Sequence, residues 1–394
     1  MQNKERIFAE IQQILTYDYA KCNMPVAHEQ FSVTPNMSDE AFINMLERYI
    51  ASFKDQQLAI QVKNDVQPNI GFSVRRYEQA LYVTEASDET RLHIGDAIVE
   101  IDGVPVADIA NHMTQQTLMC AKEITVRQRS SFITIVLTHY RRKPYQPVYE
   151  AKMLQQNCFY MKFTDFGESY PVQQLLAQYE NTLATVDHLI IDVRQNYGGN
   201  DVYMYPLLDY VFDAPTSLKE LYKEEKEYTN FTPRNCQLLL QMYEDYLREP
   251  LDNETVRALD HEMFQIEQHR GKGFVKVTQE VDYIFDGARM PKHIYVLTDK
   301  DCAGTGEMLV ALAKKSPKVT VVGRPTKGTM ATFNVVRVDV GDVVLYYPTS
   351  IMDEKSVFAS NEGIVPHIEV QWTPQHLIED VDVKKVLSLI NTSL

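Results

Sequence analysis

The stretch TDKDCAGTGEMLVALAKK, residues 298–315, has the residue types and the setting of a catalytic turn. The apolar strand HIYVL, 293–297, leads into it, and apolar side chains at helical spacing follow it. α/β enzymes place a nucleophile in such strand-to-helix turns, next to a general base. The small and potentially reactive residues of this turn are Cys302, Gly304, Thr305 and Gly306. Only Cys302 and Thr305 carry a side chain that could attack a substrate.

The cysteines and histidines of the chain show which other kinds of reactive or metal-binding site to expect. A helix N-terminus lowers the pKa of a nearby thiol, so Cys302 could be reactive, although such a cysteine is more often a small buried hydrophobe. The five cysteines form no CxxC pair, and the ten histidines form no HExxH motif. We therefore expect no disulfide framework, no metal site and no zinc knuckle. No nucleotide-binding glycine-rich loop is present either, so we expect no cofactor.

A second stretch, HLIIDVRQNYGGND, could supply hydrogen-bond donors to a substrate. It begins as an apolar strand and ends in a polar loop that contains Gly198 and Gly199. Paired glycines let backbone N–H groups point at a bound oxygen, as in an oxyanion hole. The alternative interpretation is a plain turn.

The elements that must position these loops fall into three regions. Residues 1–62 show two helical patterns, Ile7–Tyr19 and Asp39–Phe53, which predict an N-terminal helical segment. Residues 63–143 are rich in short strand patterns. Residues 148–394 alternate strands and helices, which is typical of an α/β core.

Residues 217–280 interrupt the α/β pattern. They are strongly charged, and their apolar spacing is helical, with no strand pattern. We predict a helical insertion that packs over the cleft as a lid or pairs with a second subunit. If that is right, its deletion should leave the α/β core folded.

Composition and charge exclude several classes of function. With 394 residues and 44% apolar side chains, the chain should form globular domains. The formal net charge of −15 opposes nonspecific binding to nucleic acid or anionic lipid. No secretory signal and no membrane-spanning stretch is apparent, so a cytoplasmic location is expected.

In their order along the chain, these stretches resemble the C-terminal processing peptidase and tricorn core family of serine peptidases. The family's glycine-rich loop matches HLIIDVRQNYGGND, and its elbow ending in Glu matches CAGTGE. VTVVGRPTKGT, YYPTS and NEGIVPHIEV match three later segments, and GDAIVEIDGVPV resembles the PDZ domain that such peptidases carry. The resemblance implies a tricorn-core or ClpP-like α/β spiral, with a PDZ-like β-rich domain at 63–143 and an N-terminal helical segment.

The same resemblance implies that the catalytic residues are lost. The family's serine lies three residues before the elbow Glu, which is Gly304 in this chain. The lysine base of the processing branch falls on Thr329, with Lys327 two residues earlier. The histidine base of the tricorn branch is replaced by Gln57, while Glu362 matches the acidic member of the tricorn set.

A serine peptidase needs a nucleophile and a base in contact, and neither glycine nor glutamine can fill these roles at neutral pH. The hypothesis is therefore a catalytically impaired pseudo-peptidase. One alternative is an active hydrolase that uses Thr305 as a displaced nucleophile with Lys327 as its base. A second alternative is a purely structural scaffold.

Peptide binding could survive the loss of catalysis. PDZ domains capture a C-terminal carboxylate with backbone N–H groups of a glycine-containing loop, beside an edge strand. In QPNIGFSV, residues Asn69, Ile70 and Gly71 would form that loop, and the strand would begin at Phe72. The expected partner is a peptide or a protein C-terminus. Whether the chain also forms a homo-oligomer is left open.

Overall fold

The computed structural model describes residues 3–23, 31–34, 36–63, 68–141, 143–248, 253–277 and 282–392. Close contacts divide the chain into two compact units. The first comprises Met1–Asn64 and Pro147–Glu369, and the second comprises Asp65–Gln146 and Val370–Leu394. The sequence analysis assigned the last 25 residues, 370–394, to the α/β core, whereas these contacts group them with the second unit.

The first unit contains a six-stranded sheet in the order β10-β11-β12-β17-β18-β21. Its strands are parallel except for β10, which pairs antiparallel with β11 at one edge. The bounds are β10 Tyr149–Gln155, β11 Cys158–Phe163, β12 His188–Asp192, β17 His293–Thr298, β18 Val319–Gly323 and β21 Ile368–Glu369. Every residue of β12 is buried, as expected for a central parallel strand that is covered on both faces.

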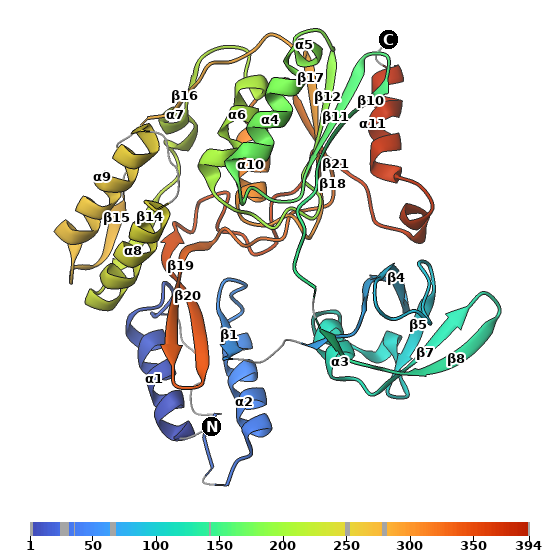
Figure 1. Ribbon diagram of the computed structural model, residues 1–394, viewed down its shortest axis with the longest axis vertical. Helices are drawn as coiled ribbons and strands as arrows, with labels where there is room; N and C mark the ends of the chain where they lie inside the picture. The colour runs from blue at the N-terminus through green and yellow to red at the C-terminus, as the bar shows by residue number, and fades with distance from the viewer. Residues whose placement is uncertain are drawn as a thin grey trace. The chain divides into compact units, whose positions relative to one another are not determined.

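Helices α4, α6 and α10 cover one face of this sheet (Figure 1). Apolar side chains from the sheet and these helices form one core, which includes Met161, Ile191, Val296 and Leu309. The helix bounds are α4 Ser169–Gln178, α5 Glu180–Leu183, α6 Asp201–Val211 and α10 Thr305–Ala313. The carboxyl ends of the neighbouring strands β12 and β17 lead into α6 and α10, so the two loops of interest meet at one edge of the sheet.

A second sheet in the first unit has the order β1-β20-β14-β15, and β19 also pairs with β20. Helices α1, α2, α8 and α9 share a second core with it, which includes Leu46, Leu239, Ile266 and Leu345. The bounds are α1 Lys4–Tyr17, α2 Asp39–Ala51, β1 Ala59–Val62, β14 Glu227–Phe231, α8 Pro233–Tyr246, α9 Asn253–His269, β15 Gly273–Val277, β19 Thr332–Val340 and β20 Val343–Met352. Both N-terminal helices occur where the sequence predicts them, and the side chain of Ser38 caps α2 by accepting a hydrogen bond from the Ala41 N–H.

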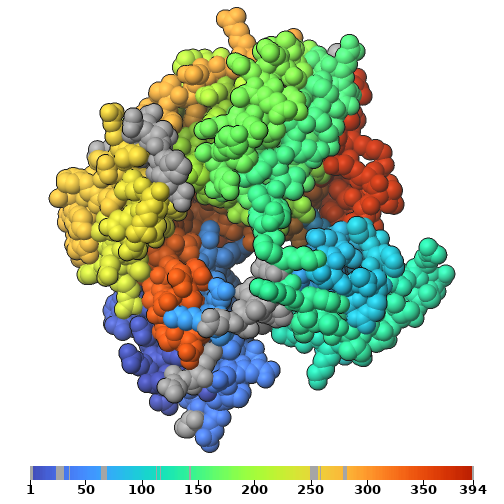
Figure 2. Space-filling model, viewed as in Figure 1, coloured from blue at the N-terminus to red at the C-terminus, as the bar shows by residue number. Residues whose placement is uncertain are grey.

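The prediction that 217–280 is purely helical is wrong. The segment contains α7 (Leu218–Tyr222), α8 and α9, but it also contains the strands β14 and β15. β14 pairs antiparallel with both β15 and β20, so it lies inside the second sheet. α8 and α9 expose one side to solvent, seen in yellow in Figure 2, but bury Leu239 and Ile266 in the core shared with α1 and α2. Deleting the segment would remove two strands and part of a core. Two short strands at the ends of the segment, β13 (Thr216–Ser217) and β16 (Ile284–Phe285), pair antiparallel with each other.

The second unit is built around an antiparallel sheet in the order β3-β4-β5-β7-β8, with β6 paired to β5. Its core includes Leu81, Ile98, Leu118 and Val126. The bounds are β2 Pro68–Asn69, β3 Phe72–Tyr77, β4 Ala80–Ala86, β5 Ala97–Ile101, β6 Val104–Pro105, α3 Thr114–Cys120, β7 Glu123–Gln128, β8 Ser131–Val136, β9 Tyr140–Arg141 and α11 Val381–Thr392. β3 and β8 are the two edge strands of this sheet.

No helix of the described residues combines the length and the apolar character needed to cross a membrane.

The second core generates a test of the role of α8. Leu239 is 2% exposed and packs among residues of the N-terminal helices. We expect Leu239→Ala to lower the free energy of unfolding by about 2–5 kcal/mol, because it leaves a cavity in that core. Gln237→Ala, at an exposed position of the same helix, should change it by less than about 0.5 kcal/mol. Urea unfolding followed by circular dichroism measures both, and equal stability of the two variants would show that α8 is not part of the core.

Candidate functional site

The turn after β17 has the shape of a nucleophile elbow. Gly304, at the N-cap of α10, has φ 53° and ψ −123°. Residues other than glycine rarely adopt this backbone conformation. A Cβ at Gly304 would meet only the Cα atom of Gly198, at 3.4 Å, so the space next to it is open. At Gly306, by contrast, a Cβ would lie 2.8 Å from Oδ1 of Asn196. Close packing therefore explains the glycine at 306, and backbone conformation alone explains the one at 304.

The carboxylate of Glu307 organises this turn from within the protein. It is 1% exposed and accepts hydrogen bonds from several groups on two segments. Oε1 accepts from the Thr326 hydroxyl at 2.7 Å and from the Gly328 N–H at 2.7 Å. Oε2 accepts from the Thr329 N–H at 2.8 Å, from the Gly304 N–H at 3.2 Å and from the Thr329 hydroxyl. These bonds fix the elbow against the turn 326–329.

The two glycines after β12 lie against the elbow. A Cβ on Gly198 would come within 3.5 Å of the Thr305 nitrogen, and one on Gly199 would overlap the backbone of Phe166 at 2.2 Å. The Gly198 N–H donates to Oδ1 of Asn196 at 2.9 Å, so it is not available to a substrate. The N–H groups of Gly199 and Thr305 donate to no acceptor among the described residues. These two groups are the candidate donors to a carbonyl oxygen.

Asn196 connects the two loops. Its backbone oxygen accepts from the Ala303 N–H at 2.8 Å, and its Nδ2 donates to the Phe163 oxygen at 2.9 Å. The side chain is fully buried. The structure thus brings Gly198 next to Gly304, and Gly199 next to Thr305.

Gln57 and Thr329 also belong to this site. Nε2 of Gln57 donates to the backbone oxygen of Thr329 at 3.2 Å, although the two residues are 272 positions apart. The Thr329 hydroxyl lies 3.0 Å from the Gly304 nitrogen and is hydrogen-bonded to Glu307. Thr329 therefore contacts the elbow directly, and Gln57 contacts Thr329. Neither an amide nor a hydroxyl can act as a base at neutral pH.

Asp55 holds the turn that carries Gln57, and the sequence analysis did not identify it. Its carboxylate accepts from the Gln57 N–H at 2.9 Å, from the Tyr19 hydroxyl at 2.7 Å and from the Thr332 hydroxyl at 3.0 Å. Lys21 lies 3.6 Å away. The spacing of Asp55 and Gln57, two residues apart, is a local turn signal, but its distant partners are visible only in the folded chain.

Among the described residues, the Thr305 side chain forms its hydrogen bonds with partners other than Lys327. Thr305 is 3% exposed, and its hydroxyl lies 2.7 Å from Oδ1 of Asp201 and 3.0 Å from the Gly199 oxygen. Lys327 is exposed, and its backbone N–H donates to the Cys302 oxygen at 2.8 Å. The hydroxyl of Thr305 is thus directed into the protein, toward the N-terminus of α6.

Glu362 lies in an exposed turn next to the segment 326–328. Its N–H donates to the Ser360 hydroxyl at 3.1 Å. A Cβ on Gly328 would lie 2.4 Å from the Asn361 oxygen, so the two turns are in close backbone contact. The Glu362 backbone is therefore near the site, whereas its side chain is exposed to solvent.

Cys302 is fully buried, and burial raises the pKa of its thiol well above the usual value. A thiol in that environment stays protonated and does not act as a nucleophile. The structure therefore favours the interpretation of Cys302 as a small buried hydrophobe.

Two carboxyl groups in the protein interior near the elbow have a raised pKa. Burial raises the pKa of Asp201, and the hydrogen bond from Thr305 opposes that shift. Burial and the nearby charges of Asp201, Glu262 and Glu225 raise the pKa of Glu227 to about 7. Sequence reasoning missed this group, because Glu227 belongs to β14 and reaches Asp201 only through the tertiary fold. No set of three or more His, Cys, Asp or Glu side chains in the described part of the chain has the geometry of a metal site.

In the second unit, the segment Asn69–Phe72 leads into the edge strand β3. Gly71 has φ 80°, and its N–H donates to Oδ1 of Asn69 at 3.0 Å. Its oxygen accepts from the N–H of Ser87 at 2.9 Å, while Ile70 and Phe72 are buried in the core. One N–H of the predicted carboxylate loop is thus already used within the protein.

Comparison with known proteins places this site in a family. The model of peptidase family S41 matches residues 157–370, which is more than half of the chain. The match includes the loop with Gly198 and Gly199, the elbow at Gly304, and Glu362. The chain belongs to peptidase family S41. No curated protein matches it by sequence.

Solved structures show the same fold over nearly the whole chain. Mature CPAF has a TM-score of 0.71 at 13% identity and covers 99% of this chain and 98% of its own. The photosystem II D1 C-terminal processing protease has a TM-score of 0.51 at 14% identity, with 98% of each chain covered. A putative S41 protease from Bacteroides fragilis has a TM-score of 0.50 at 14% identity, with 98% and 97% covered. The predicted family and the predicted α/β fold are confirmed.

The role of Glu307 can be tested by changing one carboxylate oxygen to an amide. Glu307→Gln leaves at least one buried N–H or hydroxyl without an acceptor, so we expect a loss of about 3 kcal/mol in the free energy of unfolding. Glu362→Gln, at an exposed carboxylate, should change it by less than about 0.5 kcal/mol. Denaturant unfolding of both variants is the measurement. If the two variants unfold alike, Glu307 does not organise the turn as described.

Proposed function

We propose that this S41-family protein binds peptides without hydrolysing them. The observation that carries the proposal is Gly304, which occupies the nucleophile position and keeps the backbone conformation of an elbow without any reacting group. An enzyme with that glycine cannot form an acyl intermediate at this position.

The surroundings of Gly304 support the same conclusion. The two positions that match the family's bases are Gln57 and Thr329, and both are engaged in hydrogen bonds within the protein. The loss of one triad member already lowers turnover by several orders of magnitude, and here both nucleophile and base are replaced.

The features that bind a substrate backbone are retained. The N–H groups of Gly199 and Thr305 are free to donate hydrogen bonds to a carbonyl oxygen, and Glu307 holds the elbow that carries Thr305. Binding through backbone donors needs no catalytic side chain. A peptide carbonyl next to Gly304 is the ligand group that this geometry favours.

A hydrolase that uses Thr305 with Lys327 is the competing function. It would require the Thr305 hydroxyl to leave Asp201 and turn toward solvent, since the side chain is now buried and directed toward α6. It would also require a base that the structure places at the surface instead of beside that hydroxyl. A purely structural role is the third alternative, and it predicts no peptide binding.

The first test addresses catalysis. The purified protein should not cleave an unfolded protein or fluorogenic peptides, and a fluorophosphonate probe should not label it. Gly304→Ser adds a hydroxyl in open space, but we expect no turnover, because no base adjoins it. Labelling of the natural chain that disappears in Thr305→Ala would instead support the displaced nucleophile.

The second test addresses peptide binding by the second unit. One structural relative is a C-terminal processing protease of the photosystem II D1 protein, which favours a polypeptide C-terminus as the ligand class. The edge strand β3 could pair with such a peptide, while the N–H groups of the Asn69–Phe72 segment approach its carboxylate.

We expect labelled peptides that end in an apolar residue to bind with a dissociation constant near 1 μM, or roughly −8 kcal/mol. Amidation of the C-terminus should abolish binding, because it removes the charge that the loop captures. Fluorescence anisotropy of matched acid and amide peptides is the measurement. Equal binding of the two forms would remove the loop from the proposal, and no binding of either form would favour a structural role.

A further inference from the structure

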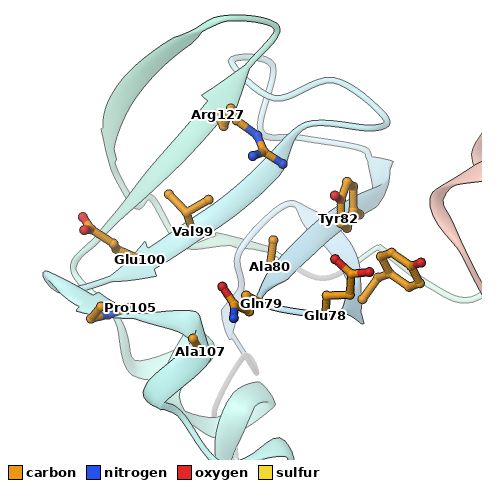
Figure 3. Close-up of a pocket in the computed structure, with 10 residues that line it drawn as sticks. Glu78, Gln79, Ala80, Tyr82, Val99, Glu100, Pro105, Ala107 and Arg127 are labelled. Atoms are coloured by element: carbon orange, nitrogen blue, oxygen red, sulfur yellow. The ribbon is translucent and has the colours of Figure 1, made fainter.

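A pocket of about 380 Å³ opens on the sheet of the second unit (Figure 3). Residues of the β3–β4 hairpin and of β5 and β7 line it. They include Tyr77, Glu78, Tyr82, Glu100 and Arg127. In Figure 3, Arg127 lies on one side of the pocket, and Gln79, Pro105 and Ala107 lie on the other.

Strand alternation puts this pocket on the face of the sheet that is opposite the core. Leu81, Ile98 and Val126 are neighbours across three strands, and all three are buried in the core. The adjacent row consists of Tyr82, Ala97, Arg127 and Phe132, which must point to the other face. The pocket is therefore a feature of the outer face, separate from the apolar core of the unit.

The lining combines aromatic rings with negative charge. Tyr77 and Tyr82 have ring centroids 6.2 Å apart, and Glu78 and Glu100 are among the residues that line the same pocket. The Glu78 charge raises the pKa of Tyr77, which places that carboxylate close to the ring. π faces and carboxylates both attract cations, most strongly ammonium and guanidinium groups.

The surface around the pocket suits an extended chain better than an isolated cation. Phe132 follows Arg127 in the same cross-strand row and is 64% exposed, and Val136 on the same strand is also 64% exposed. Residues that flank a bound side chain could cover these apolar groups. Arg127 is also exposed, and among the described residues its guanidinium forms no ion pair, so it is available to backbone carbonyl oxygens.

We propose that this pocket binds the basic side chain, lysine or arginine, of an extended peptide. The ammonium or guanidinium group lies between the tyrosine rings and the two glutamates, and the flanking backbone lies near Arg127. The site is independent of Gly304 and of carboxylate capture, so it can be tested whether or not those proposals hold.

The chain contains a natural reporter for this pocket. Trp372 is its single tryptophan, and its ring centroid lies 6.4 Å from those of both Tyr77 and Tyr82. Tryptophan fluorescence of the full chain can be titrated with acetyl-GGRGG-amide, and with the same peptide carrying Gln or Glu at the central position. We expect saturable binding of the Arg peptide only. Free argininamide should bind roughly tenfold more weakly, because it lacks the flanking residues.

Charge variants separate a cation site from an anion site. The double variant Glu78→Gln/Glu100→Gln should weaken binding of the Arg peptide roughly tenfold or more, whereas Glu123→Gln, exposed on the same sheet face outside the pocket, should change it less than about twofold. Arg127→Gln should change affinity less than the double variant does, because it removes a like charge and a donor to the peptide backbone at the same time. The proposal is overturned if no peptide binds, if the Glu peptide binds better than the Arg peptide, or if Arg127→Gln abolishes binding while the double variant does not.

Discussion

The buried carboxylate of Glu307 is the interaction on which the candidate site depends. It joins the N-terminus of α10 to the turn 326–329 through hydrogen bonds from Gly304, Gly328 and Thr329. A buried charge is stable only when such donors surround it, so each bond also fixes the backbone that supplies it. Gln57 then attaches to this turn through the Thr329 oxygen. The N-terminal segment is thus hydrogen-bonded to the turn that Glu307 holds.

This network explains how the unusual backbone conformation of the elbow at Gly304 is held. The conformation of Gly304 is a sparsely populated one, and such conformations survive when the surrounding structure determines them. Glu307, Asn196 and the close approach of Gly198 provide that determination, and none of them is a reacting group. The backbone shape of the elbow therefore does not depend on a reacting side chain at position 304.

Binding and catalysis place different demands on the same loops. Binding a peptide backbone needs oriented N–H groups, and glycine supplies these as well as any residue. Catalysis needs, in addition, a nucleophile in contact with a base, which is a relation between side chains. The ionisable side chain that contacts Thr305 is an acid and not a base. Burial raises the pKa of both Asp201 and Glu227. The Thr305 hydroxyl thus faces a buried carboxyl group, Asp201. Among the described residues, no lysine or histidine forms a hydrogen bond with this hydroxyl.

The sequence by itself determined the family, the α/β core, the N-terminal helices and the loops that carry Gly198 and Gly304. These features depend on local patterns, such as helical periodicity, the Ser38 cap and motif order, which a linear chain displays directly. It misassigned 217–280, because β14 and β15 gain their stability from pairing with each other and from the pairing of β14 with β20, which lies far along the chain. Tertiary structure alone brought Gln57 to Thr329, and Glu227 to Asp201. Contacts between segments so far apart depend on how the whole chain packs, and no local pattern records them.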